Sequence, residues 1–132
     1  MIRYLYRAAD ALRRRSFPDN HGRMGEDMAH RYLREHGCIV VARNYRARSG
    51  PGEIDLVAWH RERLVFVEVK TRSTVEFGTP DRAVDQDKRT ALERTAREYA
   101  RRANVGWERT RFDIVSVVLE KPVRIEWLQD AW

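Results

Sequence analysis

The stretch from Leu64 to Arg72 constrains the fold of this chain more than any other segment, because it has the composition of a buried strand. β-branched and aromatic residues follow one another almost without interruption, as is typical of strands inside a protein. Glu68 and Lys70 interrupt the run and, being two residues apart, point to the same face. An unpaired buried carboxylate costs several kcal/mol even after the structure relaxes. That face therefore needs a partner for Glu68.

The other predicted elements surround this strand in a recognisable order. Apolar spacing predicts a helix over residues 21–36, ended by Gly37, and a second helix from an N-cap at Thr79 to about Ala103. We expect strands over residues 38–46, 53–60, 64–72 and 111–120, with a short fifth over 123–128. The short polar link of residues 60–63 predicts an antiparallel hairpin between the second and third strands. The α-β-β-β-α-β order predicts an α/β sandwich around a central mixed sheet.

The length and the charge distribution favour one domain with a basic leader. A chain of 132 residues is large enough for a single core but not for two. Residues 1–18 hold five arginines and one aspartate, so they carry +4 of the net +6 and leave +2 for the other 114 residues. We predict a basic leader helix over residues 1–18, docked or frayed, and a domain over 19–132. The alternative is a basic arm that touches phosphates or an anionic membrane surface.

Cysteine and hydropathy patterns exclude several protein classes. The one cysteine, Cys38, lies in an apolar stretch and fits a core position; it cannot form a disulfide within the chain or a thiolate zinc site. The four histidines show no zinc-like spacing, and we expect the four tryptophans to pack in the core and at its edges. No window approaches the roughly 18 apolar residues of a membrane span, and the N-terminus lacks the apolar stretch of a secretory signal. We expect a cytoplasmic protein.

Two acidic residues of the predicted hairpin point to a metal site. Strand pairing can place Asp55 beside Glu68, and two neighbouring carboxylates repel unless a cation lies between them. Mg²⁺ prefers one or two carboxylates together with water and substrate phosphate. Such an ion polarises a phosphoryl oxygen and activates a bound water, while Lys70 would orient that water or stabilise the charge on the phosphate. With Glu26 as a third carboxylate, these residues predict metal-assisted phosphodiester hydrolysis.

The same residues resemble a known enzyme superfamily. An aspartate (Asp55) followed by Glu68-Val69-Lys70 on a hairpin resembles the PD-(D/E)XK nuclease superfamily, and Glu26 on the preceding helix resembles its Holliday-junction-resolvase branch. A linked set of motifs over about residues 20–120 is similar to the YraN-like family of small bacterial proteins: Gly22-x-x-Gly25-Glu26, Asn44-Tyr45-Arg46, Gly52-Glu53-Ile54-Asp55-Leu56, Val67-Glu68-Val69-Lys70-Thr71-Arg72, Lys88 and Phe112-Asp113.

The resemblance implies a restriction-endonuclease-like fold and a set of site residues. It places Asp55, Glu68 and Lys70 at catalytic positions, with Glu26 as an added acid and Mg²⁺ or Mn²⁺ held by the three carboxylates. Two departures stand out. Ile54 replaces the proline of the motif name, and the Gln-x-x-x-Tyr signature of some branches is absent because Thr90 follows Gln86 by four residues.

The expected partner is nucleic acid, with DNA favoured over RNA. We expect Lys88, Arg46 and Arg72 to contact it, and a homodimer is an option because cutting two strands takes two sites. Lys88 lies beside the buried stripe of its helix, so it either reaches a phosphate at the site or extends to solvent with its stem buried. The leading hypothesis is a metal-dependent endonuclease acting on DNA, with branched or distorted structures among its candidate substrates.

Several alternatives remain open at this stage. The charged residues of the hairpin also fit a solvated strand face without metal, and Glu26 also fits a solvated helix residue near the positive end of its helix. Glu53 suits a surface position next to a turn, and Asp113 either supports the site or faces outward. At the level of function, the alternatives are a non-catalytic nucleic-acid-binding module that keeps the fold and an interaction protein anchored through residues 1–18.

Overall fold

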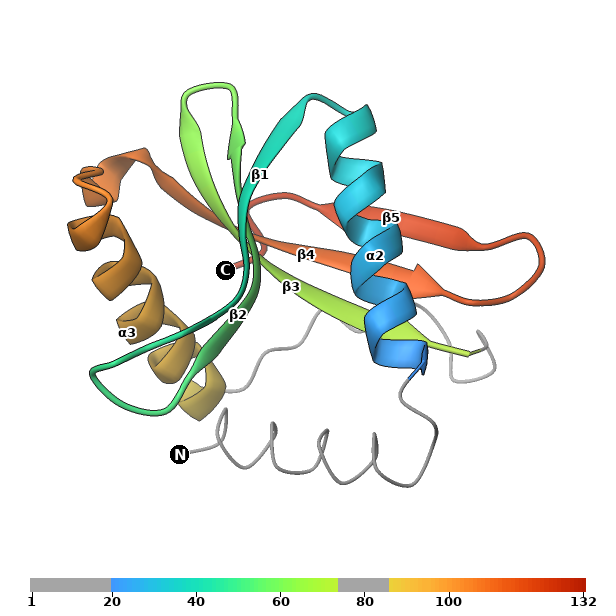
Figure 1. Ribbon diagram of the computed structural model, residues 1–132, viewed down its shortest axis with the longest axis horizontal. Coiled ribbons are helices and arrows are strands. Elements are labelled where there is room, and N and C mark those ends of the chain that lie inside the picture. The colour runs from blue at the N-terminus through green and yellow to red at the C-terminus, as the bar shows by residue number, and fades with distance from the viewer. Residues whose placement is uncertain (1–19, 74–85) are drawn as a thin grey trace.

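The computed structural model of the chain describes residues 20–73 and 86–132, which form a five-stranded sheet with one long helix on each face (Figure 1). The elements in chain order are α2 (Asn20–Glu35), β1 (Cys38–Arg46), β2 (Glu53–His60), β3 (Arg63–Arg72), α3 (Gln86–Arg102), the 3₁₀ turn η1 (Trp107–Arg109), β4 (Thr110–Val118) and β5 (Arg124–Leu128). The predicted leader helix, and the predicted helix start at Thr79, lie outside the described residues.

The strands form one mixed sheet in the order β1-β2-β3-β4-β5. β1, β2 and β3 follow one another as antiparallel neighbours, β4 runs parallel to β3, and β5 returns antiparallel to β4. The parallel pair requires a crossover, and α3 lies in it. The predicted α/β class, element order and mixed sheet are confirmed, and the architecture is compatible with a restriction-endonuclease-like fold.

β3 lies at the centre of the sheet and is buried on both faces, as its composition predicts. Leu64 and Phe66 belong to the apolar cluster under α3, whereas Val65 and Val67 belong to the cluster under α2. Each helix therefore covers one side of the same strand. Parity along β3 then places Glu68 and Lys70 on the α3 side of the sheet.

Both helices end where local backbone conformation requires it. Gly37 has a φ of +93°, the left-handed conformation that glycine favours after a helix, and it ends α2 as predicted. At the end of α3, Asn104 takes this conformation (φ 58°) and the Val105 amide donates to the Ala100 carbonyl at 2.8 Å. The apolar spacing of this helix predicts that Ala103 faces inward. This prediction is wrong, because the helix ends at Arg102 and Ala103 is exposed.

A buried carboxylate of α3 holds the turn between β1 and β2. Glu98 accepts hydrogen bonds from the Tyr45 hydroxyl at 2.7 Å and from the backbone amides of Arg48 and Ser49 at 2.9 and 2.8 Å. Gly52 lies so close to the same helix that an added Cβ would meet the Thr95 Oγ1 at 2.2 Å. These contacts fix the point at which β2 begins.

The hydrogen bonds to Glu98 also control its ionisation. Burial alone would raise the pKa of the Glu98 carboxyl, but the hydrogen bonds from Tyr45 and from the amides of Arg48 and Ser49 outweigh it and lower that pKa from 4.5 to about 2. The folded state therefore favours ionised Glu98. Glu98 stabilises the folded state fully above about pH 4.5, and this contribution is lost as the pH falls towards 2.

Glu98→Gln tests this role without changing the size of the side chain. We expect the free energy of unfolding at pH 7 to fall by about 2 kcal/mol, because three donors lose a charged acceptor. The deficit should shrink at about pH 3, where the wild-type protein has also lost part of the contribution. Urea unfolding of both proteins at the two pH values measures this difference in the free energy of unfolding.

Glu93→Gln is the matched control on the same helix. The Glu93 side chain is half exposed and pairs with Arg97 across one helical turn, at 3.3 Å. We expect a loss below about 0.5 kcal/mol, as for other surface pairs. An equal deficit in the two variants, or one that does not change with pH, would contradict the role of Glu98.

Candidate functional site

β2 separates from β3 at Asp55. From this point the Asp55 side chain, and not the β2 backbone, bonds to the backbone of β3. The paired residues end at Leu56 and Val67, so the next pair in that register would be Asp55 and Glu68. Instead of a β2 carbonyl, the Asp55 Oδ2 accepts the Val69 amide hydrogen at 2.8 Å. A carboxylate held by a backbone donor has a fixed orientation. The predicted proximity of Asp55 to the Glu68 segment is therefore confirmed.

The departure of β2 from the ladder also breaks the alternation of its side chains. Leu56 packs in the apolar cluster under α2, whereas Ile54 packs in the cluster under α3. The alternation of a regular strand predicts that Ile54 and Leu56 share one face, and this prediction is wrong. On the N-terminal side of Asp55, β2 is paired with β1 through Ile54 and Tyr45 but is not paired with β3. This part of β2 is therefore free to leave the plane that β2 and β3 share.

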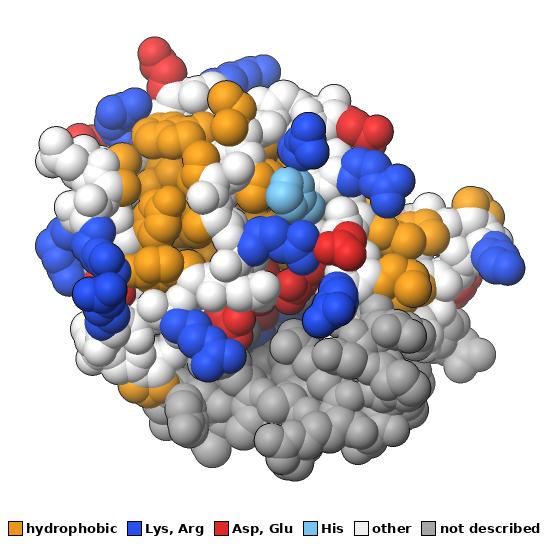
Figure 2. Space-filling model, viewed as in Figure 1, with side chains coloured by type: hydrophobic (Ala, Val, Ile, Leu, Met, Phe, Trp, Pro, Cys, Tyr) orange, Lys and Arg blue, Asp and Glu red, His pale blue; other side chains and the backbone are white. Residues whose placement is uncertain are grey.

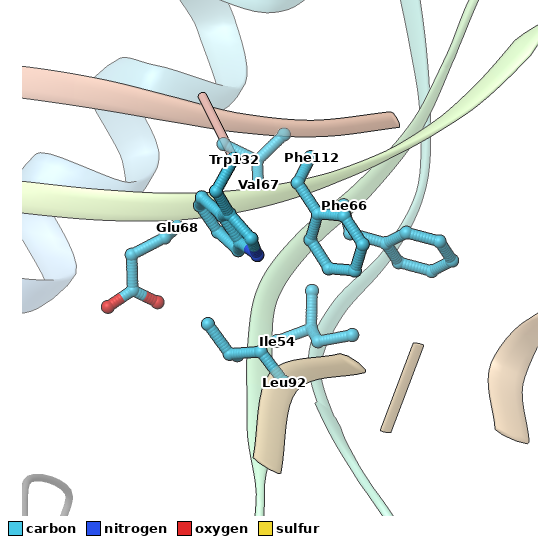
Figure 3. A pocket seen from close by; sticks show the side chains of 7 residues that line it. All are labelled: Ile54, Phe66, Val67, Glu68, Leu92, Phe112 and Trp132. Carbon is cyan, nitrogen blue, oxygen red and sulfur yellow. The ribbon is translucent and has the colours of Figure 1, made fainter. Parts of the chain in front are cut away.

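Glu68 has its charge partner on α3. The Lys88 Nζ lies 2.5 Å from the Glu68 Oε2, and the two side chains are only 2% and 4% exposed. Figure 3 shows the Glu68 carboxylate directed away from the rings of Phe112 and Trp132, with which it borders an apolar hollow. That hollow has no room for a water molecule. The Glu68 carboxylate therefore faces away from the apolar hollow and is paired with Lys88.

Lys88 settles one of the open alternatives. Its stem and its ammonium group are both buried, so the interpretation that it extends to solvent is wrong. The pairing with Glu68 requires the whole side chain to lie between α3 and the sheet. Lys88 does reach the acidic site, and a contact with phosphate there stays a prediction.

The other predicted basic residues lie at strand ends. Lys70 and Arg72 are half-buried near the end of β3, and Arg46 is exposed at the end of β1. Lys70 shares the α3 side of β3 with Glu68.

Acidic side chains gather near the middle of one face of the molecule, and lysine and arginine side chains lie on either side of them (Figure 2). Nucleic-acid contacts by Arg46 and Arg72 stay predictions.

Glu26 is buried on α2, and two residues of β1 contact its carboxylate. The Glu26 carboxylate accepts a hydrogen bond from the side-chain amide of Asn44 at 3.2 Å and lies 3.6 Å from the Arg43 guanidinium. Arg43 also pairs with the exposed Asp27 at 2.9 Å. The interpretation of Glu26 as a solvated helix residue is therefore wrong, and its role as an added acid stays a prediction.

Two further acids differ from their expected surroundings. Glu53 is buried, so the prediction of a surface position is wrong; the fixed turn before it carries it into the sheet. Asp113 is completely buried on the α2 side of β4 and accepts bonds from the Arg111 guanidinium, the Trp127 indole and the Asp130 amide at 2.8–2.9 Å. Since Glu68 and Lys70 lie on the opposite face, Asp113 does not belong to their site.

Comparisons with known proteins place the chain in a family. The model of the family described as "Uncharacterised protein family UPF0102" matches residues 25–117. The chain belongs to the UPF0102 family. A UPF0102 protein of Solibacter usitatus is 63% identical over 132 residues and covers 100% of both chains. A UPF0102 protein of Koribacter versatilis is 46% identical over 101 residues, 76% of this chain and 70% of its own. One from Rhodococcus opacus is 42% identical over 114 residues, 84% and 94% of the two chains.

The family match spans every residue discussed for the UPF0102 site. Glu26, Asp55, Glu68, Lys70 and Lys88 all lie within the matched range. Membership agrees with the likeness to the YraN-like family. None of the helices within residues 20–73 and 86–132 is long and apolar enough to cross a membrane.

The donor set of the UPF0102 site suits a metal ion with few protein ligands. Within the part of the chain that the structure describes, no three histidine, cysteine or acidic side chains lie close enough to hold an ion between them. Glu26 therefore does not form one group with Asp55 and Glu68. Two buried carboxylates do fit Mg²⁺ or Mn²⁺, because Mg²⁺ commonly takes one or two carboxylates and completes its shell with water and substrate phosphate.

Two contacts of buried charged side chains in the UPF0102 chain were not foreseen from its sequence. The Lys88–Glu68 pair had a weak signal, because Lys88 lies four residues before Leu92 on the buried stripe of α3. The Glu98 contact had a similar signal, since Glu98 follows the buried Thr95 by three residues. In both cases spacing places the residue on the inner side of the helix but does not name its partner.

Gly25→Ala tests how closely α2 must approach β3 to position Glu26. An added Cβ would lie 1.9 Å from the Thr71 Oγ1 and 2.9 Å from its Cβ, so the helix has to move. We expect the free energy of unfolding to fall by about 2 kcal/mol, as in overpacked cores. Urea unfolding gives the value, and Thr71→Ala in the same chain should recover part of it. Equal losses with and without Thr71→Ala would contradict this close approach.

Proposed function

We propose that this UPF0102 protein is a metal-dependent endonuclease that hydrolyses phosphodiester bonds in DNA. The observation that carries the proposal is that Asp55 and Glu68 are both buried where β2 leaves β3, with the Asp55 carboxylate bonded to the amide of Val69, the residue after Glu68. A fold places two acids in one apolar region at a considerable cost in free energy, and functional sites are where such placements concentrate.

The chain's own residues have distinct roles in this proposal. Asp55 and Glu68 would hold Mg²⁺ or Mn²⁺, and the amide of Val69 keeps the Asp55 carboxylate oriented for this task. The ion, when bound, supplies a polarised phosphoryl oxygen and a water of lowered pKa. Lys70 would orient the attacking water or stabilise the negative charge that grows on the phosphate. Glu26 would act as a further acid on the α2 side, outside the pair of carboxylates that would hold the ion.

The substrate assignment rests on charge and on resemblance. Arg46 and Arg72 lie at the ends of β1 and β3 and would contact the DNA backbone by phosphate pairing. A phosphate would reach Lys88 only at the site itself, because the ammonium group is buried on Glu68. We propose branched or distorted DNA as the substrate, a cytoplasmic location, and a homodimer when both strands are cut.

Two observations favour a second function. The Glu68 charge is already balanced by Lys88, and the described residues hold no three-ligand metal group. A non-catalytic nucleic-acid-binding module that keeps the fold would need nothing more. Such a module would bind DNA with a steep salt dependence and cleave it under no divalent ion.

Cleavage assays separate the two functions. We expect wild-type protein to cut four-way junctions in Mg²⁺ or Mn²⁺ but not in EDTA, with duplex and single-stranded DNA as comparison substrates. Asp55→Asn and Lys70→Met should each lower the cleavage rate by at least about 100-fold, because each removes a group that acts on the reacting phosphate. Both variants should keep the wild-type circular dichroism spectrum, which checks that they fold.

Lys121→Met is the matched control for Lys70→Met. Lys121 is exposed in the loop between β4 and β5 and has no place in the proposed site. We expect it to cleave at the wild-type rate. Cleavage that persists in purified Asp55→Asn, or its absence from wild-type protein under every ion and substrate, would refute the endonuclease.

A further inference from the structure

Lys88 is the one lysine or arginine that is buried among residues 22–73 and 86–132. A buried ammonium group is costly unless an anion lies against it, and the Glu68 Oε2 does so at 2.5 Å. α3 therefore delivers a positive charge to the very carboxylate that is proposed to hold a metal ion.

A divalent ion and the Lys88 ammonium group would have the same electrostatic effect at this site. Either of them lowers the repulsion between the carboxylates of Asp55 and Glu68, and each repels the other strongly where water is excluded. We propose, on the basis of the proposed metal-dependent function, that Lys88 is a positioning residue that competes with the metal ion for Glu68 and thereby weakens metal binding in the absence of DNA.

The contacts of the two acids define where the competition takes place. The Asp55 Oδ2 is engaged by the Val69 amide, a neutral donor that an ion does not have to displace. The Glu68 Oε2 is engaged by the Lys88 ammonium, a cation that lies where a second positive charge would approach. An ion that takes both oxygens of Glu68 has to move Lys88, whereas an ion that also receives a DNA phosphate oxygen gains a ligand to offset this cost.

Metal titration of Lys88→Met tests the competition without DNA. Isothermal titration calorimetry with MnCl₂ should give a dissociation constant at least about 10-fold lower for this variant than for wild-type protein, because the competing charge is gone. Lys121→Met keeps the wild-type constant, since its ammonium group is exposed and outside the site. Equal or weaker binding by Lys88→Met, including no binding by either protein, would overturn the proposal.

Wild-type protein gives a second test that does not depend on how well the variant folds. The chain has only three lysines, Lys70, Lys88 and Lys121, so ¹⁵N-lysine labelling yields an ammonium spectrum that single variants can assign. Addition of MgCl₂ should shift the Lys88 ammonium resonance and leave that of Lys121 in place. An unmoved Lys88 resonance, at a concentration where calorimetry shows bound ion, would exclude the competition.

The two proposals fail in distinguishable ways. Tighter Mn²⁺ binding by Lys88→Met in a protein that cleaves no DNA would refute the endonuclease and support the role of Lys88. Cleavage by wild-type protein together with unchanged Mn²⁺ binding by Lys88→Met would support the endonuclease and refute the role of Lys88.

Discussion

The contact between Glu68 and Lys88 joins the centre of the sheet to the helix that covers it. β3 is buried on both faces, so an acid in this strand is tolerated only if another element brings a cation to it. Removal of one member of such a pair leaves a buried charge and commonly costs about 3–5 kcal/mol. The position of α3 over the sheet, the burial of Glu68 and the closeness of Asp55 to the Glu68 segment are therefore linked.

Much of the fold follows from local patterns in the sequence. The composition of β3 and the turn residues around it predict the hairpin, and β1 and β2 have the predicted bounds. Ala103 and Ile54 were misplaced because both assignments extended a regular pattern past its end. In one case a left-handed residue, Asn104, closes the helix, and in the other a strand leaves its ladder at Asp55.

The candidate site was only partly predictable, because its details depend on contacts between distant elements. Asp55 and Glu68 were foreseen as neighbours since both belong to one hairpin with a short turn. The cation on Glu68 comes from α3, and no spacing rule connects Lys88 with β3. The burial of Glu53 likewise depends on a turn that Glu98 fixes from across the fold, 49 residues from Ser49. Spacing shows which side chains face inward, but only the packed structure shows which of them meet.

The parallel pairing of β3 with β4 has a consequence for the synthesis of this chain. β4 begins at Thr110, so a ribosome has to extrude the whole crossover before the centre of the sheet can close. Until then β3 is an edge strand, with its apolar side chains and open backbone groups able to pair with other nascent chains. A transcript that ends before Thr110 would thus encode an aggregation-prone product, which chaperones and proteases would have to remove.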